Sequence, residues 1–400
     1  MTEINKVPAI RFIAFGSEWV EQELGEIAEF NPKSELPDVF EYVDLESVVG
    51  TEIIAHRVEN KATAPSRAKR LARKGDLFFQ TVRPYQRNNH LFSKPCQNYV
   101  FSTGYAQLRP QVDGYFLLSL VQKEAFVKSV LDRCTGTSYP AINSDTLAEI
   151  VNRVPLKLKE QSQIGSFFQN LDSLITLRQQ KYAKLATVKK AMLEKMFPKD
   201  GADASEIRFK EFAEKWEKRQ LGEIVSEEKR PIELKDEHEY ELVTVKRRNE
   251  GVVSRGKLRG KDILVKNYYE VRTGDYVISK RQVVHGANGV VPQSLDKAIV
   301  SNEYLVAIGN ERITTDFFAL LSKRPHMYKK FFLSSYGVDI EKLVFDVDDW
   351  KKRYVYVPCP AEQQRISSFF QNLDSLITLQ LRELDKLKNI KKACLDKMFV

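Results

Sequence analysis

Two short stretches of the sequence mix cations with planar polar side chains, and this mixture is suited to contacts with nucleic acid. Lys and Arg can pair with phosphates, while Asn, Gln and Arg can form hydrogen bonds with base edges. The first stretch is QTVRPYQRNNH, residues 80–90, and the second is SKRQVVHGAN, residues 279–288. Each begins at the end of a Gly-Asp-led run of β-branched and aromatic residues, so we expect each to follow a strand.

A basic cluster accompanies each stretch: SRAKRLARK, residues 66–74, and VKRRNEGVVSRGKLRGK, residues 245–261. A weaker candidate is the loop TGTSYPAINSD, residues 135–145, whose counterpart SSYGVDIEK is shorter. Most charged runs are solvated loops, which is the alternative interpretation of all these segments. The residues predicted to contact nucleic acid are Arg67, Lys69, Arg70, Gln80, Arg83, Tyr85, Arg87, Asn88, Asn89, Ser138 and Tyr139 in the first half, and Lys246, Arg247, Arg248, Arg255, Lys280, Arg281, Gln282, His285 and Asn288 in the second.

Motifs of catalysis do not accompany these candidates. GVVSRGK, residues 251–257, fits the pattern of a phosphate-binding loop, but Leu258 stands where Ser or Thr would hold magnesium. The Asn31-Pro32 pair is followed by Lys33, which breaks the N-P-P-Y/F motif of adenine methyltransferases. The five histidines are scattered without ligand or triad spacing, and the cysteines form no C-x-x-C pair, which argues against zinc and disulfides. We therefore predict no catalytic residues, no metal and no cofactor in this chain.

The composition points to a polyanionic partner. The chain has 400 residues, and its 63 Lys and Arg exceed its 54 Asp and Glu to give a net charge of +9. Excess cationic charge favours phosphate-rich partners. No apolar run reaches the ~18 residues of a membrane span, and the N-terminal residues lack the apolar stretch of a signal peptide. We therefore expect a cytoplasmic protein.

The sequence is an internal repeat of near-identical ends around divergent middles. The string SFFQNLDSLITL occurs at residues 166–177 and again at 368–379. The pattern I-R-F-x-x-F-x-x-x-W-x-x-x-x-L-G-E-I occurs at residues 10–27 and 207–224. Identical segments must meet each other or two copies of one partner, whereas divergent segments are free to meet different targets. The repeat therefore predicts one scaffold that carries two different binding regions.

A long helix is predicted at the end of each repeat, over about residues 160–197 and 361–399. Neither segment has an interior Pro, and strong helix formers predominate. At 1.5 Å per residue such a helix would be about 57 Å long, and burying its apolar stripe calls for the other helix. The predicted contact residues are Leu171, Leu174, Leu185, Val188 and Met192 in the first helix, and Leu373, Leu376, Leu387, Ile390 and Cys394 in the second.

These motifs resemble the specificity subunits of type I restriction-modification systems. The helix LDSLITLRQQKYAKLATVKKAMLEKMFP and the N-terminal pattern, both doubled around variable middles, carry the resemblance over the whole chain. It implies an α+β fold class, with two mixed α/β target recognition domains in tandem and two long antiparallel helices that form a coiled coil between them. The expected segments are a first recognition domain at 1–155, a helical spacer at 156–198, a linker at 199–213, a second recognition domain at 214–357 and a second helical spacer at 358–400.

The resemblance also implies a function and partners. Each recognition domain would read one half of a bipartite, asymmetric sequence in double-stranded DNA. Two modification (methyltransferase) subunits using S-adenosylmethionine would bind the scaffold, and restriction (motor-nuclease) subunits using ATP and magnesium could join them. Two other interpretations remain: a coiled-coil assembly scaffold without DNA readout, and a stand-alone enzyme such as a nuclease. A pure scaffold gives no reason for Arg, Lys, Asn and Gln to recur at one place in both divergent middles.

Overall fold

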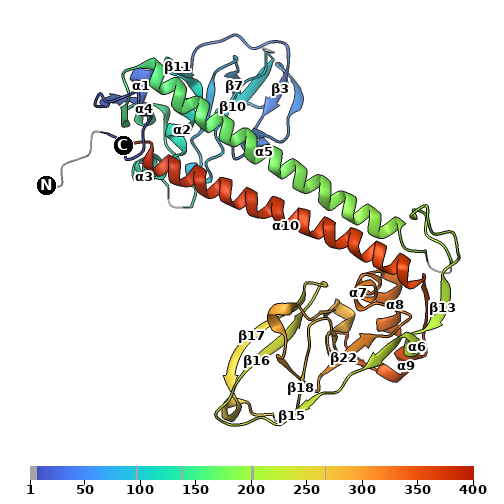
Figure 1. The fold of residues 1–400 in the computed structure, drawn as a ribbon. Coiled ribbons are helices and arrows are strands. Elements are labelled where there is room, and N and C mark those ends of the chain that lie inside the picture. The colour runs from blue at the N-terminus through green and yellow to red at the C-terminus, as the bar shows by residue number, and fades with distance from the viewer. Residues whose placement is uncertain (1–6, 96–97, 137, 200–201, 266) are drawn as a thin grey trace. The chain divides into compact units, whose positions relative to one another are not determined.

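The computed structural model describes residues 7–95, 98–136, 138–199, 202–265 and 267–400. The chain forms two compact units, Met1–Lys181 with Gln380–Val400, and Tyr182–Leu379 (Figure 1). Each unit contains one divergent middle and a part of both long helices. In the described part of the chain, no helix combines the length and apolar character needed to span a membrane.

The first unit, before its long helix, has short strands in two four-stranded sheets and two strand pairs. The sheet orders are β6-β3-β10-β7 and β2-β11-β8-β9, and the pairs are β1-β12 and β4-β5. The elements are β1 (Val20–Glu23), α1 (Leu24–Ile27), β2 (Ala28–Phe30), β3 (Val39–Val43), η1 (Leu45–Ser47), β4 (Val48–Val49), β5 (Glu52–Ile53), β6 (Arg57–Asn60), β7 (Ala68–Leu71), β8 (Leu77–Gln80), η2 (Pro84–Gln86), β9 (His90–Leu91), β10 (Tyr99–Ser102), β11 (Tyr105–Pro110), α2 (Gly114–Gln122), α3 (Glu124–Leu131), α4 (Ser144–Ala148) and β12 (Val151–Val154).

The second unit repeats this order, with five strands instead of four in one sheet. Its sheets are β15-β18-β21-β16-β17 and β14-β22-β19-β20, with the pairs β13-β25 and β23-β24. The elements are β13 (Glu217–Gln220), α6 (Leu221–Ile224), β14 (Val225–Glu227), β15 (Pro231–Ile232), β16 (Glu239–Lys246), β17 (Gly251–Arg259), η3 (Gly260–Asp262), β18 (Tyr268–Glu270), β19 (Tyr276–Ser279), η4 (Val283–His285), β20 (Asn288–Val290), η5 (Gln293–Leu295), β21 (Ile299–Ser301), β22 (Tyr304–Gly309), α7 (Thr315–Ser322), α8 (Pro325–Leu333), β23 (Ser335–Tyr336), η6 (Ile340–Lys342), β24 (Val344–Phe345), α9 (Val347–Lys351) and β25 (Tyr354–Val357).

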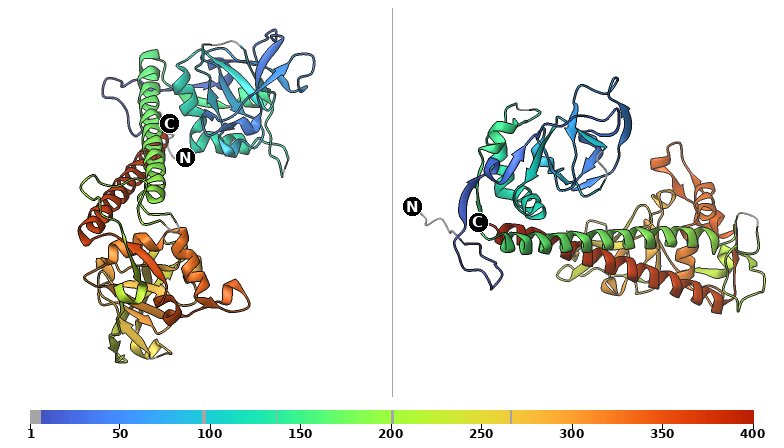
Figure 2. Two further views of the ribbon diagram at one scale, coloured as in Figure 1. Left: turned by 90° about the vertical axis from the view of Figure 1, so that its right-hand side faces the viewer. Right: turned by 90° about the horizontal axis from the view of Figure 1, so that it is seen from above.

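The two long helices are α5 (Leu158–Lys195) and α10 (Pro360–Lys397), as the sequence predicts. Within the first unit, Asp172 of α5 pairs with Lys391 of α10 at 2.5 Å, and Arg178 pairs with Glu383 at 3.2 Å. Higher numbers in α5 thus face lower numbers in α10, so the helices are antiparallel (Figures 1 and 2). In the second unit the ion pair between Lys189 and Asp374 has the same sense.

Three residues predicted to lie in the helix contact are instead exposed. Leu174, Leu376 and Ile390 are 46%, 45% and 39% exposed, whereas Leu171 and Leu373 are buried. Leu373 lies in the core of the second unit, against which Leu185 and Met192 of α5 also pack. The prediction was wrong for these three leucine and isoleucine side chains because a 3-4 spacing does not say which stripe is covered.

Each repeat sends the end of its long helix into the core of the other unit. Phe399 packs in the first unit against Trp19, Phe116 and Phe168, with ring centroids 5.5–6.1 Å apart. Phe197 packs in the second unit against three rings at the matching places: Trp216, Phe317 and Phe370. Backbone hydrogen bonds follow the same rule, since Ile10 N donates to Lys397 O and Ile207 N donates to Lys195 O. The near-identical ends are therefore core segments of both units.

A buried ion pair joins the start of each long helix to the N-terminal pattern of its repeat. Arg11 donates to both carboxylate oxygens of Glu160 at 2.6 and 2.8 Å, and Arg208 does the same to Glu362 at 2.7 and 2.6 Å. Both glutamates are fully buried. Since a buried carboxylate needs such a partner, removing either arginine would strongly destabilise its unit. This explains why the arginine of the I-R-F motif is present in both copies.

Candidate nucleic-acid interface

The first polar loop, residues 80–90, connects β8 to β9 through η2. It contains two residues with left-handed backbone, Arg83 and Arg87, each at φ 55°. Such conformations are costly for residues other than glycine and persist only where the surroundings hold them. Buried amides do so here: Asn89 Oδ1 accepts from Gln80 N at 2.9 Å, and Gln80 Nε2 donates to Val82 O at 2.7 Å.

Gln80 and Asn89 were both predicted to contact nucleic acid. Their exposures are only 2% and 1%, so their side chains cannot reach a base while the loop keeps this conformation. Their hydrogen bonds instead fix the loop. The residue type was suggestive, but amides that hold a turn and amides that read a base look alike in a sequence.

The exposed part of this loop meets the loop at residues 135–145. The guanidinium of Arg83 lies over the ring of Tyr139, 4.4 Å from its centroid, and Arg83 N donates to Pro140 O at 2.8 Å. Tyr139 is 62% exposed, and its neighbour Ser138 is exposed as well. Two segments predicted separately thus form one surface, on which a cation stacked on an aromatic ring faces solvent beside the half-exposed Tyr85.

Two other candidates in the first polar loop are held by neighbouring segments. Arg87 pairs with Glu124 and donates to Gln122 O at 3.2 Å. The hydrogen bond from Arg87 holds the pKa of the Glu124 carboxyl below its usual value. Asn88 Oδ1 accepts from Gly50 N at 2.8 Å. These contacts anchor the loop to α3 and to the β4-β5 turn.

The basic cluster of the first unit lies on β7, an edge strand. Arg67, just before it, and Lys69 are exposed. Arg70 is half-buried, and within the described residues its Nε has no hydrogen-bond partner. Burial lowers the pKa of Arg70. This strand presents cations along the edge of the sheet β6-β3-β10-β7.

The second polar loop, residues 279–288, lies at the matching place between β19 and β20, with η4 where the first has η2. Asn288 is 3% exposed, and its Oδ1 accepts from Tyr276 OH at 2.7 Å. It therefore holds the loop, as Asn89 does, and is also unsuited to direct contact with nucleic acid. Gln282 is half-buried, and its Oε1 has no partner in the described part of the chain.

Acidic side chains pair with Arg281 and His285 of the second polar loop and with Arg247 beside it. Arg281 pairs with Glu303 at 2.9 Å, and Lys280 Nζ donates to Asn302 O at 2.9 Å. Glu341 accepts from Arg247 at 2.6 Å and lies 3.3 Å from His285. Thus the segment 335–342, which corresponds to the first unit's 135–145 loop, brings a carboxylate to the second polar loop.

The second basic cluster forms a hairpin that leans on the second polar loop. Lys246, Arg247 and Arg248 are exposed at the turn between β16 and β17, and Arg255 is exposed on β17. Arg248 N donates to His285 O at 2.7 Å. The two basic clusters are not equivalent in position: β17 corresponds to β6 at one edge of the sheet, whereas β7 lies at the other edge.

The GVVSRGK segment lies in β17, which pairs along its length with β16. A phosphate-binding loop instead joins a strand to a helix N-terminus, so this segment has the wrong geometry for one. In the described ranges no three His, Cys, Asp or Glu side chains gather as a metal site would require. Cys134, Cys359 and Cys394 are free thiols, and Cys96 lies outside the described residues.

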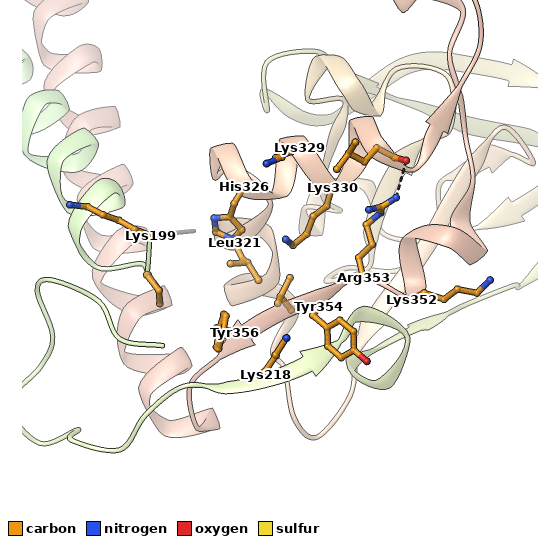
Figure 3. A pocket seen from close by; sticks show the side chains of 13 residues that line it. Lys199, Lys218, Leu321, His326, Lys329, Lys330, Lys352, Arg353, Tyr354 and Tyr356 are labelled. Atoms are coloured by element: carbon orange, nitrogen blue, oxygen red, sulfur yellow. Dashed lines mark hydrogen bonds between the residues drawn. The ribbon is translucent and has the colours of Figure 1, made fainter. Parts of the chain in front are cut away.

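A cationic cavity in the second unit was not predicted from the sequence. It has a volume of about 510 Å³ and is lined by residues of α8, β13 and β25 and by residues 198–199 and 352–353 (Figure 3). Its cations come from several separate segments of the sequence, so their gathering could not be predicted from one segment alone. Aligning the two repeats residue by residue could have found it, because Glu21 of β1 stands where β13 has Lys218.

Known proteins share this architecture. The family model for the type I restriction modification DNA specificity domain matches residues 16–187 and again 213–389. The chain is 24% identical to the type I restriction enzyme HindI specificity subunit of Haemophilus influenzae, over 45% of this chain but only 41% of that protein. It is 23% identical to the MjaVIII specificity subunit of Methanocaldococcus jannaschii, over 71% of this chain and 68% of that protein. The crystal structure of the type I restriction-modification S subunit from M. genitalium has a similar fold, with a TM-score of 0.56 at 14% identity, and the match covers 98% of this chain and 99% of that one.

Proposed function

Because this chain belongs to the family of type I restriction-modification DNA specificity proteins, we propose that it selects the DNA sequence on which a type I complex acts. It would read a bipartite, asymmetric target, one half with each unit. The observation that carries this proposal is the pair of polar loops: each follows the same strand of its unit, each is held by a buried asparagine, and each exposes different side chains. One scaffold with two different exposed surfaces fits two different half-sites.

The proposed readers are the exposed side chains around these loops. In the first unit they are Arg83, Tyr85, Ser138 and Tyr139, with Arg67 and Lys69 placed to meet phosphates. In the second unit Arg255 and the hairpin cations are exposed, and Arg281 and Arg247 would exchange their carboxylate partners for DNA. Base contacts give specificity, and phosphate contacts give affinity and register.

Two modification subunits are the proposed partners of the repeated helix segment. Leu174 and Leu177 are 46% and 58% exposed in the first unit, and their copies Leu376 and Leu379 are 45% and 50% exposed in the second. Four exposed leucines in two identical sequences are suited to two copies of one apolar partner surface. Adenine methylation with S-adenosylmethionine would belong to these partners, and ATP- and magnesium-dependent cleavage to restriction subunits, whereas this chain would catalyse neither.

The partner surface can be tested by the composition of the assembled complex. Leu174→Ser with Leu177→Ser should leave one modification subunit bound instead of two, and so should Leu376→Ser with Leu379→Ser, as read by native mass spectrometry. All four changes together should leave none. Gln179→Ser with Gln180→Ser, at exposed positions of the same helix, is the matched control. Full binding of both subunits to the fourfold variant would exclude this surface.

Sequence selection can be tested by mapping adenine methylation in cells with and without the gene. We expect a split motif that disappears with the gene. Exchanging residues 20–155 for the matching domain of another specificity subunit should change one half of that motif and leave the other. A motif that changes in both halves would contradict the two-reader proposal, and a methylome indifferent to the gene would favour an assembly scaffold without DNA readout.

The long helices are proposed to set the number of unspecified base pairs between the half-sites. Inserting four residues between Leu177 and Tyr182 of α5 lengthens that helix by about 6 Å, which corresponds to one or two base pairs. The methylated motif of this variant should keep its specified bases and gain spacer length. An unchanged spacer in an active complex would show that the helices do not measure the distance.

A further inference from the structure

The cationic cavity of the second unit has no role in the function proposed above. Its lining contains six Lys and Arg and no Asp or Glu: Lys199, Lys218, Lys329, Lys330, Lys352 and Arg353, together with His326. In Figure 3 the amino groups of Lys218 and Lys330 face the middle of the space, while Lys199 and Lys352 lie toward opposite ends. Lys218 and Lys330 are therefore the labelled lysines whose amino groups face this space.

The first unit lacks these lysines at the matching positions. Lys218 stands opposite Tyr356 in the β13-β25 pair, whereas Glu21 stands opposite Arg153 in β1-β12 and pairs with it at 2.9 Å. The N-caps of α3 and α8 are Lys123 and Arg324, and when these are aligned, Ser129 stands at the position of Lys330. At the C-caps of α4 and α9, Glu149 takes the place of Lys352. The scaffold folds without these lysines, so the fold does not require them.

We propose that this cavity binds backbone phosphates of double-stranded DNA, as a contact of the second unit separate from its polar loop. The proposal rests on the DNA-binding function proposed above. The helix α8 connects the two places: its His326, Lys329 and Lys330 line the cavity, and it also packs against η4 of the second polar loop. DNA held by the loop would thus have cations on both sides of one short helix.

The chemistry of the lining favours a nucleic-acid backbone over a small nucleotide. Pockets for small molecules usually hold only a few placed polar groups, whereas six of the thirteen residues that line this cavity are Lys or Arg. Its tyrosines do not offer a free stacking face for a base. Lys218 Nζ lies over the Tyr354 ring, 4.9 Å from its centroid, Gln220 donates to the Tyr354 hydroxyl at 2.8 Å, and Tyr356 packs on the core.

One cation of the lining has a structural role instead. Arg353 donates to Leu333 O at 2.9 Å and pairs with Asp349 at 2.7 Å, so it braces the wall between α8 and α9. Lys218, Lys330 and Lys352 are the side chains proposed to meet phosphates. Lysine is suited to this task because each ammonium is a compact charge that can follow a phosphate without fixed geometry.

The test is lysine footprinting of the full chain in its complex, with a random-sequence duplex of about 30 base pairs as the probe. Acetylation of each lysine, with and without duplex, is read by mass spectrometry. Lys218, Lys330 and Lys352 should be protected severalfold. Lys246 and Lys280 report on the polar-loop region, and the exposed Lys229 and Lys235 of the same unit are the unprotected references.

A matched pair of variants gives the second arm. Lys218→Glu with Lys330→Ser places in the second unit the residues that the first unit holds, so the fold should tolerate both. Lys229→Glu with Lys235→Ser makes the same change of charge elsewhere on the unit. The cavity variant should bind duplex about tenfold more weakly and lower the salt slope of log K by one to two, since each lost phosphate contact removes about 0.9. The control should change far less.

The pattern of protected lysines distinguishes failure of the cavity proposal from failure of the proposed DNA-binding function. Protection of Lys246 and Lys280 without protection of the cavity lysines would overturn the cavity proposal and leave the function intact. Protection of neither group by duplex would overturn both. Protection of the cavity by tripolyphosphate but not by duplex would also overturn the proposal, in favour of a small phosphate ligand.

Discussion

The two polar loops share a frame but differ in how their cations are balanced. In the first unit Arg87 pairs with Glu124, but Arg83 is stacked on Tyr139, and the described residues give Arg83 no acidic partner. In the second unit Arg281 faces Glu303, and Arg247 and His285 share Glu341. A stacked cation is held in place but keeps its charge for a ligand, whereas a paired cation must first give up a carboxylate. In the proposed DNA complex, Arg83 would need no change of partner, whereas Arg281 and Arg247 would first have to release their carboxylates.

The buried asparagines that hold the two loops are alike, whereas the exposed cations differ, because folding constrains only the buried residues. Asn89 and Asn288 hold both loops from inside, at matching positions, since an unsupported loop would not keep one conformation. The exposed side chains contribute little to folding and are free to differ.

Removing the phenylalanine at the end of one long helix should destabilise one unit and leave the other stable. Phe399→Ala should destabilise the first unit by about 3–5 kcal/mol, the usual cost of removing a buried phenylalanine, and Phe197→Ala should do the same to the second. Hydrogen exchange read by mass spectrometry should show lost protection in the unit that receives the ring. Loss of protection in the repeat that supplies the ring would contradict the crossed packing.

Removing the stacked cation should weaken one half-site alone. Arg83→Ala should lower affinity for the mapped target about 10- to 100-fold, the range for a lost specific contact. Tyr139→Phe keeps the ring under the guanidinium and should change affinity little. Fluorescence anisotropy at one salt concentration gives the values. On a duplex whose first half-site is scrambled, Arg83→Ala and the unchanged protein should bind equally, and a difference there would mean that Arg83 reads no sequence.

Removing a carboxylate from the second unit should make it resemble the first. Glu341→Gln leaves Arg247 and His285 without their acidic partner and should raise affinity for random duplex roughly two- to fivefold, the scale of an exposed ion pair. Affinity for the true target should rise less, so discrimination should fall. Glu237→Gln, at an exposed site in another part of the unit, is the control. Improved discrimination would show that Glu341 does not act against unspecific DNA.

Acid should loosen the first polar loop more than the second. Burial among Phe92 and Phe101 lowers the pKa of His90 below its ordinary 6.5, and the matching position of the second loop is Gly289. When the pKa of a histidine is lower in the folded state than in the unfolded state, its contribution to the free energy of unfolding is complete above the unfolded-state pKa. This contribution is lost as pH falls below about 6.5. Hydrogen exchange of residues 80–91 should therefore speed up from pH 7.5 to 5.5, after correction for intrinsic rates, more than that of residues 279–290. In His90→Gln this extra pH dependence should vanish.

Much of the architecture follows from the sequence alone. The repeated SFFQNLDSLITL string and the I-R-F pattern identify the duplication, and the absence of interior Pro with abundant helix formers places both long helices. These signals are local, since propensity and periodicity act within one segment. The place of both polar loops after matching strands was predictable for the same reason.

Tertiary structure decided which side chains of each segment face solvent. Gln80, Asn89 and Asn288 were indistinguishable by type from base-reading amides, and only their burial assigns them to the loop frame. Leu174 and Leu376 follow the same helical spacing as Leu171 and Leu373, and only the packing of the folded chain separates the exposed positions from the buried ones.

The cationic cavity could be identified only from the tertiary structure. Lys218, Lys330 and Lys352 come from three distant segments, and each looks like an ordinary surface lysine in the sequence. Burial, exposure and the gathering of charge are set by contacts between residues far apart in the chain. A linear pattern records the spacing of residues along one element, and the packing of several elements determines which of them meet.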